Sequence, residues 1–147
     1  MRLEYSFGFC KAELLTLKVS DVDLIGGTIL LRDSNYGEPR KIALTAGAKN
    51  LLTACVTAIG PEDSVFMRKS GNSVKDFRVR WDKLTLAAGV AGLLFHDLRY
   101  SAVRNMVRTG IPEVVCMKVS GQKTRYVFDR YNVTSDRDLA DAARKLS

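Results

Sequence analysis

The spacing of apolar residues predicts that most of this chain is helical. A first helical pattern follows Gly8-Phe9-Cys10, with its leucines facing inward and Glu13 and Lys18 facing outward. Further helices are expected where capping or breaking residues such as Thr45, Ser73 or Gly110 bound an apolar pattern. They cover about Ala46–Ile59, Val74–Ala88, His96–Thr109, Glu113–Lys118 and Asp136–Lys145.

Two runs of alternating or β-rich residues predict a β-hairpin. Thr28–Leu31 and Arg40–Leu44 are separated by Asn35-Tyr36-Gly37-Glu38, which has the composition of a turn. Ser64–Met67 is a short candidate for another strand. The expected fold class is therefore α+β, mainly α, with a small antiparallel sheet of two or three strands.

Composition limits the class of protein. With 147 residues, 46% of them hydrophobic and 27% charged, the chain suits one soluble globular domain and excludes a disordered or collagen-like protein. No apolar stretch reaches the roughly 20 residues that cross a bilayer, and the N-terminus lacks a secretory pattern, so a cytoplasmic location is expected. Three scattered cysteines and one histidine predict neither a disulfide framework nor a metal site.

Positive charge is concentrated in one part of the chain. The 23 Lys and Arg residues exceed the 16 Asp and Glu residues, for a net charge of +7. Residues 66–108 alone hold nine basic and three acidic residues. Such a cluster attracts polyanions, most commonly nucleic acid, but a solvated basic surface explains the charge alone equally well.

His96 and Arg99 lie three residues apart and share a helical face at the start of a predicted helix. Arg99 also borders the apolar stripe, whereas Tyr100, Arg104 and Arg108 lie on another face. A guanidinium fork, a helix N-terminus and an imidazole together suit a phosphate group. The alternative is that His96 is a structural or capping residue.

Tyr131 is either a packing residue or a nucleophile. A phenol is a poor nucleophile near neutral pH unless cations lower its pKa or a base takes its proton. Arg99, Lys123 and Arg130 are candidate cations.

The order of these motifs resembles the catalytic domain of the tyrosine recombinase (phage integrase) family. His96–Arg99 is similar to its H-x-x-R box, Val119–Thr124 to its G-H box, and Phe128–Tyr131 to the segment with its tyrosine. Upstream, Gly8–Leu15 is similar to the G-x-R-x-x-E box. The resemblance covers about Tyr5–Leu146 and implies a helical recombinase-like catalytic core.

What the resemblance implies is DNA strand exchange without a metal, ATP or another cofactor. Tyr131 would attack a phosphodiester of double-stranded DNA, form a 3′-phosphotyrosyl link and release a 5′-hydroxyl. Arginines would stabilise the charged transition state, His96 would assist proton transfer, and a hairpin lysine would protonate the leaving oxygen.

Three positions depart from the family pattern. Cys10 stands where the first arginine belongs, Asn35 where the hairpin lysine aligns, and Gln122 where a histidine is usual. Lys41 is the nearest substitute for the lysine, and Gln122 can still donate a hydrogen bond. Because a thiol carries no fixed positive charge, we expect Cys10 to impair or abolish cleavage.

The resemblance also predicts the domain organisation and the partners. The family places a DNA-clamping domain before the catalytic domain, so residues 1–147 are expected to be one N-terminally truncated catalytic-type domain without a core-binding domain. The last helix would join protomers of a homo-oligomer. A non-catalytic DNA-binding remnant and a protein-interaction module are the alternatives. The residues expected to contact DNA are Lys41, Arg104, Arg108, Lys123 and Arg125.

Overall fold

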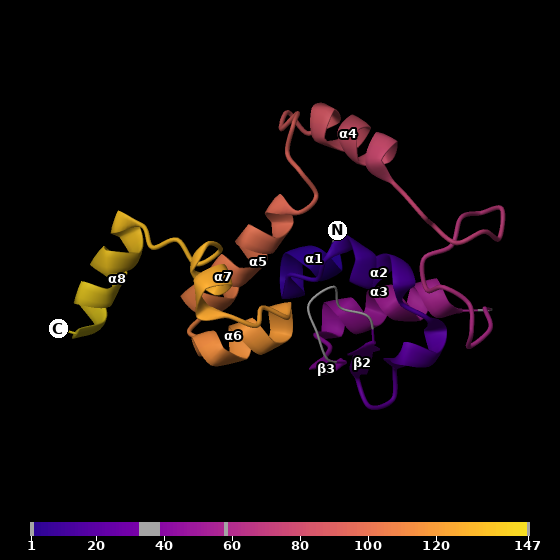
Figure 1. The fold of residues 1–147 in the computed structure, drawn as a ribbon, viewed down its shortest axis with the longest axis horizontal. Helices are drawn as coiled ribbons and strands as arrows, with labels where there is room; N and C mark the ends of the chain where they lie inside the picture. The colour runs from indigo at the N-terminus through magenta and orange to yellow at the C-terminus, as the bar shows by residue number, and fades with distance from the viewer. Residues whose placement is uncertain (1, 33–38, 58, 147) are drawn as a thin grey trace.

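A small sheet lies at the lower edge of the molecule in Figure 1, with helices above it and to its left, in this computed structural model, which describes residues 2–32, 39–57 and 59–146. The elements are α1 (Arg2–Phe7), α2 (Lys11–Thr16), the 3₁₀ turn η1 (Val19–Asp21), β1 (Val22–Asp23), β2 (Thr28–Leu31), β3 (Arg40–Ala43), α3 (Ala46–Val56), α4 (Arg78–Ala87), α5 (Asp97–Arg108), α6 (Glu113–Ser120), α7 (Arg125–Asp129) and α8 (Asp136–Leu146).

The sheet is antiparallel, with strand order β1-β2-β3. Ile29 pairs with Ile42, and Leu31 pairs with Arg40. Because side chains alternate along a strand, Arg40 lies on the same face as Ile42, the face that is buried. The predicted α+β class with a small antiparallel sheet is confirmed. The predicted turn at residues 35–38 lies outside the described residues.

The hydrophobic residues form two clusters. The larger joins α1, α2, the sheet and α3, with Phe9, Ile29 and Leu52 fully buried. The smaller joins α5, α6 and α7 around Val103 and Phe128. Helix α1 packs on α5, and Val119 of α6 contacts both clusters, so the two halves of the molecule meet along α1 and α6.

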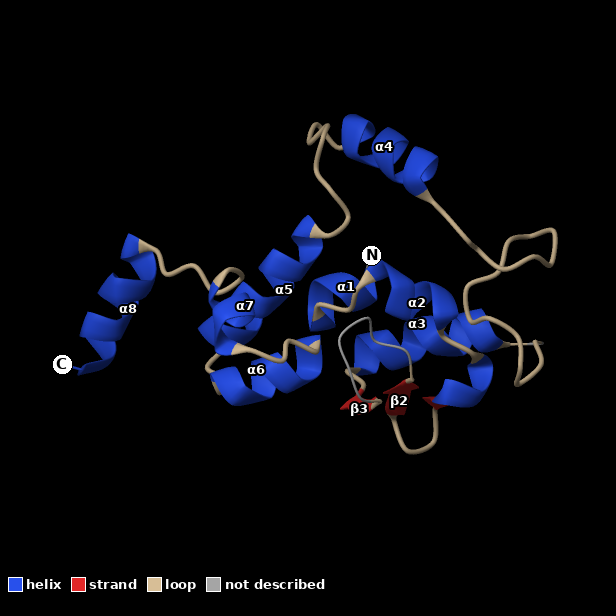
Figure 2. Ribbon diagram, in the orientation of Figure 1, coloured by secondary structure: helices blue, strands red, loops and turns tan. Residues whose placement is uncertain are grey.

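Helices α4 and α8 stand apart from these clusters (Figure 2). Trp81 holds α4 through its indole N–H, which donates to the Leu93 carbonyl at 2.6 Å, and through its contact with the Phe95 ring. Helix α8 has no buried residue. Its N-terminal end is attached to α5, because Arg108 forms an ion pair with Asp138 at 2.8 Å.

Several predicted boundaries were wrong. Helix α4 begins at Arg78 rather than Val74, because the Asp76 carboxylate accepts the N–H groups of Phe77 and Arg78. Ser73 therefore caps no helix and instead forms an isolated bridge with Met67. The candidate strand at residues 64–67 contributes only isolated bridges, and helix α1 was not predicted. The Thr45 cap was correct, since its hydroxyl accepts the Ala48 N–H.

Candidate active site

Helix α5 places His96 and Arg99 at its first turn. The Asp97 carboxylate accepts the Leu94 N–H at 2.8 Å, which fixes the chain entering the helix. His96 occupies the N-cap position, and Ala102, Val103 and Met106 anchor the helix in the core. Arg99, one turn inside, is only 5% exposed, so the prediction that it borders the core was correct.

Tyr131 follows α7 and reaches back to α5. The Thr124 hydroxyl caps α7 by accepting the Val127 N–H, and Phe128 fixes the helix in the core. The Tyr131 hydroxyl then lies 2.8 Å from His96 Nε2, within hydrogen-bonding distance. The Tyr100 ring contacts the Tyr131 ring at a centroid distance of 4.4 Å and limits its orientation. The structure therefore brings His96 and Tyr131 together across 35 positions of sequence.

Arg99 lies beside the same tyrosine. Its Cζ is 5.6 Å from the centroid of the Tyr131 ring, and its Nη2 donates to the Ser120 carbonyl at 2.7 Å. Its Nε is buried without a hydrogen-bond partner. Gly8 allows this close packing: a Cβ there would lie 3.5 Å from Arg99 Cγ and 3.3 Å from Ser120 Cβ, and its φ of +72° favours glycine.

Gln122 presents an unpaired amide in the same region. Its side chain is 6% exposed, and neither its Nε2 nor its Oε1 has a hydrogen-bond partner. Gly121 precedes it in a left-handed conformation and ends α6. Unpaired buried polar atoms are costly, so the Gln122 amide and Arg99 Nε are two donors of this region that the protein itself leaves without an acceptor. A phosphate oxygen accepts from both kinds of donor.

The electrostatics favour a neutral imidazole next to the phenol. Burial, and after it the Arg99 charge, lower the pKa of His96 from its ordinary value. His96 is therefore unprotonated at neutral pH and can accept the phenolic proton. Arg99 supplies positive charge over the ring of Tyr131.

Cys10 is the N-cap of α2 and not a cation. Its Sγ accepts the Glu13 N–H at 3.5 Å, while its own N–H donates to Glu13 Oε2 at 2.9 Å. Burial raises the pKa of the thiol, so Cys10 stays neutral. A neutral thiol that caps α2 therefore occupies position 10.

Glu13 was predicted to face outward, and this prediction was wrong. Its side chain is 3% exposed and forms a two-pronged ion pair with Arg40 of β3. Arg40 was missed by sequence reasoning because its partner is 27 positions away. The available signal was an arginine in phase with the buried residue of its strand, Ile42.

The predicted DNA-contacting residues are distributed over several surfaces. Lys41 is exposed on β3, on the opposite face from Arg40, so the structure does not bring it to Tyr131. Arg108 and Arg125 form ion pairs within the chain, with Asp138 and with Glu113 and Asp129 respectively. Lys123 is exposed and Arg104 half-buried. Asn35 lies outside the described residues.

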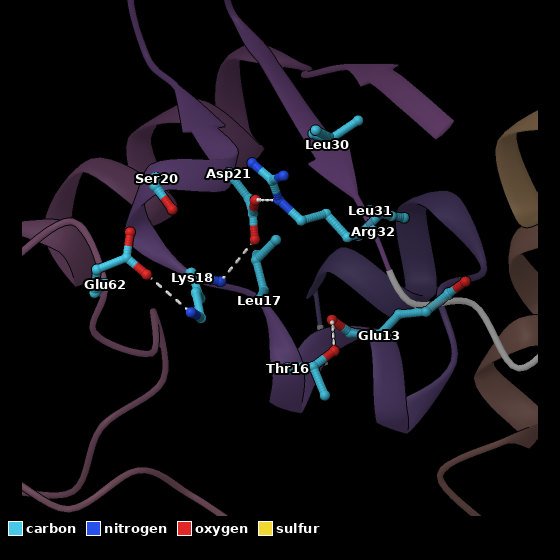
Figure 3. A pocket seen from close by; sticks show the side chains of 10 residues that line it. All are labelled: Glu13, Thr16, Leu17, Lys18, Ser20, Asp21, Leu30, Leu31, Arg32 and Glu62. Atoms are coloured by element: carbon cyan, nitrogen blue, oxygen red, sulfur yellow. Dashed lines mark hydrogen bonds and ion pairs between the residues drawn. The ribbon is translucent and has the colours of Figure 1, made fainter. Parts of the chain in front are cut away.

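A separate pocket of about 360 Å³ lies between α2 and the sheet (Figure 3). Its charges are paired: Lys18 with Glu62 at 2.9 Å, and Arg32 with Asp21. The Glu13 side chain extends away from these groups in Figure 3, which agrees with its pairing to Arg40. This pocket therefore offers no unpaired charge to a ligand.

Two kinds of site are not found in the part of the chain that the structure describes. No group of three or more His, Cys, Asp or Glu side chains could hold a metal ion there. None of the helices described is both long enough and apolar enough to cross a membrane.

The fold and the site define a class of protein. The profile of the phage integrase family matches residues 1–137. The chain therefore belongs to the phage integrase family.

Individual relatives agree with this assignment. Over 122 residues the chain is 25% identical to the shufflon-specific DNA recombinase of Escherichia coli, covering 82% of this chain and 30% of that protein. The fold resembles the crystal structure of XerA recombinase, with a TM-score of 0.81 and 19% identity over 97% of this chain and 54% of that one. It also resembles the Tn1549 transposon integrase in complex with circular intermediate DNA, with a TM-score of 0.73 and 14% identity over 99% of this chain and 58% of that one.

The chain covers only part of the length of each relative that it matches. It spans 30% of the curated relative and 54% and 58% of the two solved structures. At these low identities the structural likeness establishes the fold alone.

Proposed function

We propose that this chain is a catalytic-type domain that cleaves and rejoins DNA through Tyr131. The observation that carries the proposal is the 2.8 Å separation of the Tyr131 hydroxyl and His96 Nε2, with Arg99 alongside. The relatives whose names include recombinase or integrase support DNA as the substrate. The net charge of +7 supports a polyanionic partner.

In the proposed step the phenolic oxygen attacks a backbone phosphorus. The bond between that oxygen and phosphorus forms, and the bond between phosphorus and the 5′-oxygen breaks. His96 takes the phenolic proton, which is then available to the leaving 5′-oxygen, so a 3′-phosphotyrosyl link and a 5′-hydroxyl result. Arg99 and the Gln122 amide stabilise the negative charge on the phosphate oxygens.

In the proposal this step is slow, because Cys10 provides no positive charge to stabilise the transition state. An arginine that stabilises a phosphoryl-transfer transition state contributes on the order of 10³–10⁵ in rate, and a neutral thiol contributes no such charge. Cleavage by the natural sequence is therefore expected to be slow, and a non-catalytic DNA-binding role is the second candidate function.

A nicked suicide duplex tests the proposal, because the short cleaved strand diffuses away and the covalent complex accumulates. We expect a slow adduct with the natural sequence and a much faster one with Cys10→Arg. Tyr131→Phe abolishes the adduct in both, whereas Tyr126→Phe, which removes another tyrosine four residues after Gln122, leaves it unchanged. DNA binding without any adduct, even from Cys10→Arg, favours the non-catalytic role.

Helix α8 is the proposed contact between copies of the chain. It has no buried residue, and Leu139 is 62% exposed. A homo-oligomer assembled on DNA would cover this apolar surface. Sedimentation with and without a duplex, comparing the natural sequence with Leu139→Asp, tests this role: loss of only the larger species in the variant supports it, and identical profiles refute it.

A further inference from the structure

Arg40 joins three segments that are far apart in the sequence. Its Nη1 and Nη2 donate to the two carboxylate oxygens of Glu13 in α2, at 2.5 and 3.0 Å. Its Nε donates to the Val119 carbonyl at the end of α6, at 3.2 Å. The Arg40 side chain is 13% exposed, so water competes little for these bonds. The guanidinium therefore connects β3, α2 and the C-terminal end of α6.

The segment that Arg40 contacts leads directly to Gln122. A Cβ at Gly121 would lie 2.6 Å from Arg40 Cζ, so the glycine is needed for the guanidinium to lie against this turn. The neighbouring carbonyl of Ser120 is held by Arg99. Two arginines thus fix the consecutive carbonyls of Val119 and Ser120. Only Gly121 separates them from Gln122, whose amide is buried and unpaired.

On its other side, Arg40 reaches the N-terminus of α2. Glu13 Oε2 accepts both from Arg40 Nη2 and from the Cys10 N–H, so one carboxylate oxygen separates the guanidinium from residue 10. Glu13 balances the charge of Arg40, and every nitrogen of Arg40 already donates to the protein. Arg40 is therefore placed to hold geometry and does not replace the positive charge that Cys10 lacks.

We propose that Arg40 is a positioning residue for the proposed strand cleavage: through Glu13 and the Val119 carbonyl, it sets the place of the Gln122 amide relative to α2. This proposal rests on the proposed function, because the role of Gln122 in DNA cleavage comes from there. A planar fork with three donating nitrogens meets this need, and the single ammonium of lysine does not.

The first test separates geometry from charge. Arg40→Lys keeps the charge but cannot make all three bonds, so we expect the adduct rate at saturating DNA to fall at least about tenfold. The apparent Kd for DNA should stay within about twofold, since Arg40 is not proposed to touch DNA. Rates are measured in the natural or the Cys10→Arg chain, whichever reacts faster, and are corrected for the folded fraction.

Arg32→Lys is the matched control. Arg32 also pairs with a buried carboxylate, that of Asp21, but on the pocket described above rather than at the turn before Gln122. We expect its adduct rate to stay within about twofold of the parent chain. Equal rates for Arg40→Lys and its parent overturn the proposal, as does an equal loss in Arg32→Lys.

A second test does not depend on catalysis. The side-chain amide signals of Gln122, assigned from their loss in Gln122→Leu, should move in Arg40→Lys and stay in place in Arg32→Lys. Glu13→Gln, which keeps the size of the side chain, should move them in the same direction and serves if Arg40→Lys does not fold. Unmoved Gln122 signals refute the positioning role even where no adduct forms, whereas moved signals without any adduct support it and count against the proposed function alone.

Discussion

The two halves of the site differ in the charged and polar groups that they hold. The α5–α7 half places His96 and Arg99 against Tyr131, and the buried Arg99 Nε and Gln122 Nε2 have no acceptor within the protein. The sheet half holds Glu13 and Arg40 in a closed ion pair beside the neutral Cys10. Packing and charge in this site therefore depend on different residues: the sheet half is held together by its own ion pair, without a cation at residue 10.

The largest effect is expected when the positive charge is removed from the α5–α7 half. Arg99→Ala deletes the guanidinium next to Tyr131, and we expect the adduct rate to fall on the order of 10³–10⁵. Arg99→Lys should restore only part of this rate, since it cannot hold the Ser120 carbonyl and a phosphate together. Single-turnover cleavage at saturating DNA measures both. A loss below about tenfold in Arg99→Ala would place the essential charge elsewhere.

A smaller effect is expected from the unpaired amide. Gln122→Leu removes one transition-state donor and should lower the adduct rate about 10²–10³-fold. The same variant removes two unsatisfied buried atoms, so the free energy of unfolding should rise by about 1–2 kcal/mol. Cleavage assays and urea denaturation measure the two changes. A variant that is both less stable and fully active contradicts the assignment of Gln122 as a phosphate donor.

Glu4 is buried in α1, the helix that packs on α5 and so connects the two halves of the molecule. Burial raises the pKa of its carboxyl from 4.5 to about 8, although the Arg99 charge opposes this shift. The folded chain therefore holds a proton that the unfolded chain releases, so this contribution to stability is full below pH 4.5 and is lost as pH rises through about 8.

The free energy of unfolding of Glu4→Gln, which stays neutral, should therefore rise relative to that of the natural sequence by about 2–4 kcal/mol between pH 5 and pH 9. Denaturant unfolding at the two pH values measures the difference. Glu62→Gln is the control, because that carboxylate is exposed. Parallel pH profiles for Glu4→Gln and the natural sequence would contradict the buried, protonated carboxyl.

The mildest prediction concerns His96. Its pKa is lowered by burial and then by Arg99, so the unfolded chain binds the proton more tightly. The contribution of His96 to stability is present above pH 6.5 and is lost as pH falls through the lowered pKa. NMR titration of the His96 ring should give a midpoint below 6.5, and Arg99→Ala should raise that midpoint. A midpoint above 6.5 would mean that the imidazole is charged beside Tyr131.

Local signals in the sequence predicted much of the fold and part of the site. The Thr45 cap, the alternation around Ile42 and the helix that begins after His96 depend on neighbouring residues, and each was confirmed. The resemblance supplied the pairing of His96 with Tyr131, which residue spacing alone could not give.

The features that were missed depend on distant partners. Glu13 occupies a polar position of a helical pattern, and its buried carboxylate is balanced by Arg40, a partner 27 positions away. At the start of α4 the Asp76 carboxylate accepts the N–H groups of Phe77 and Arg78, whereas Ser73 forms a bridge with Met67. Helix α1 owes its position to packing on α5, nearly a hundred residues later.

Mapping the DNA-linked residue by mass spectrometry tests the central claim most directly. After nuclease and trypsin treatment of the complex formed on a suicide duplex, fragmentation locates the remaining nucleotide. The site geometry predicts it on Tyr131, in trace amounts from the natural sequence and in abundance from Cys10→Arg. A nucleotide on Tyr100, whose ring lies 4.4 Å from that of Tyr131, or on no tyrosine in either chain, would contradict the account.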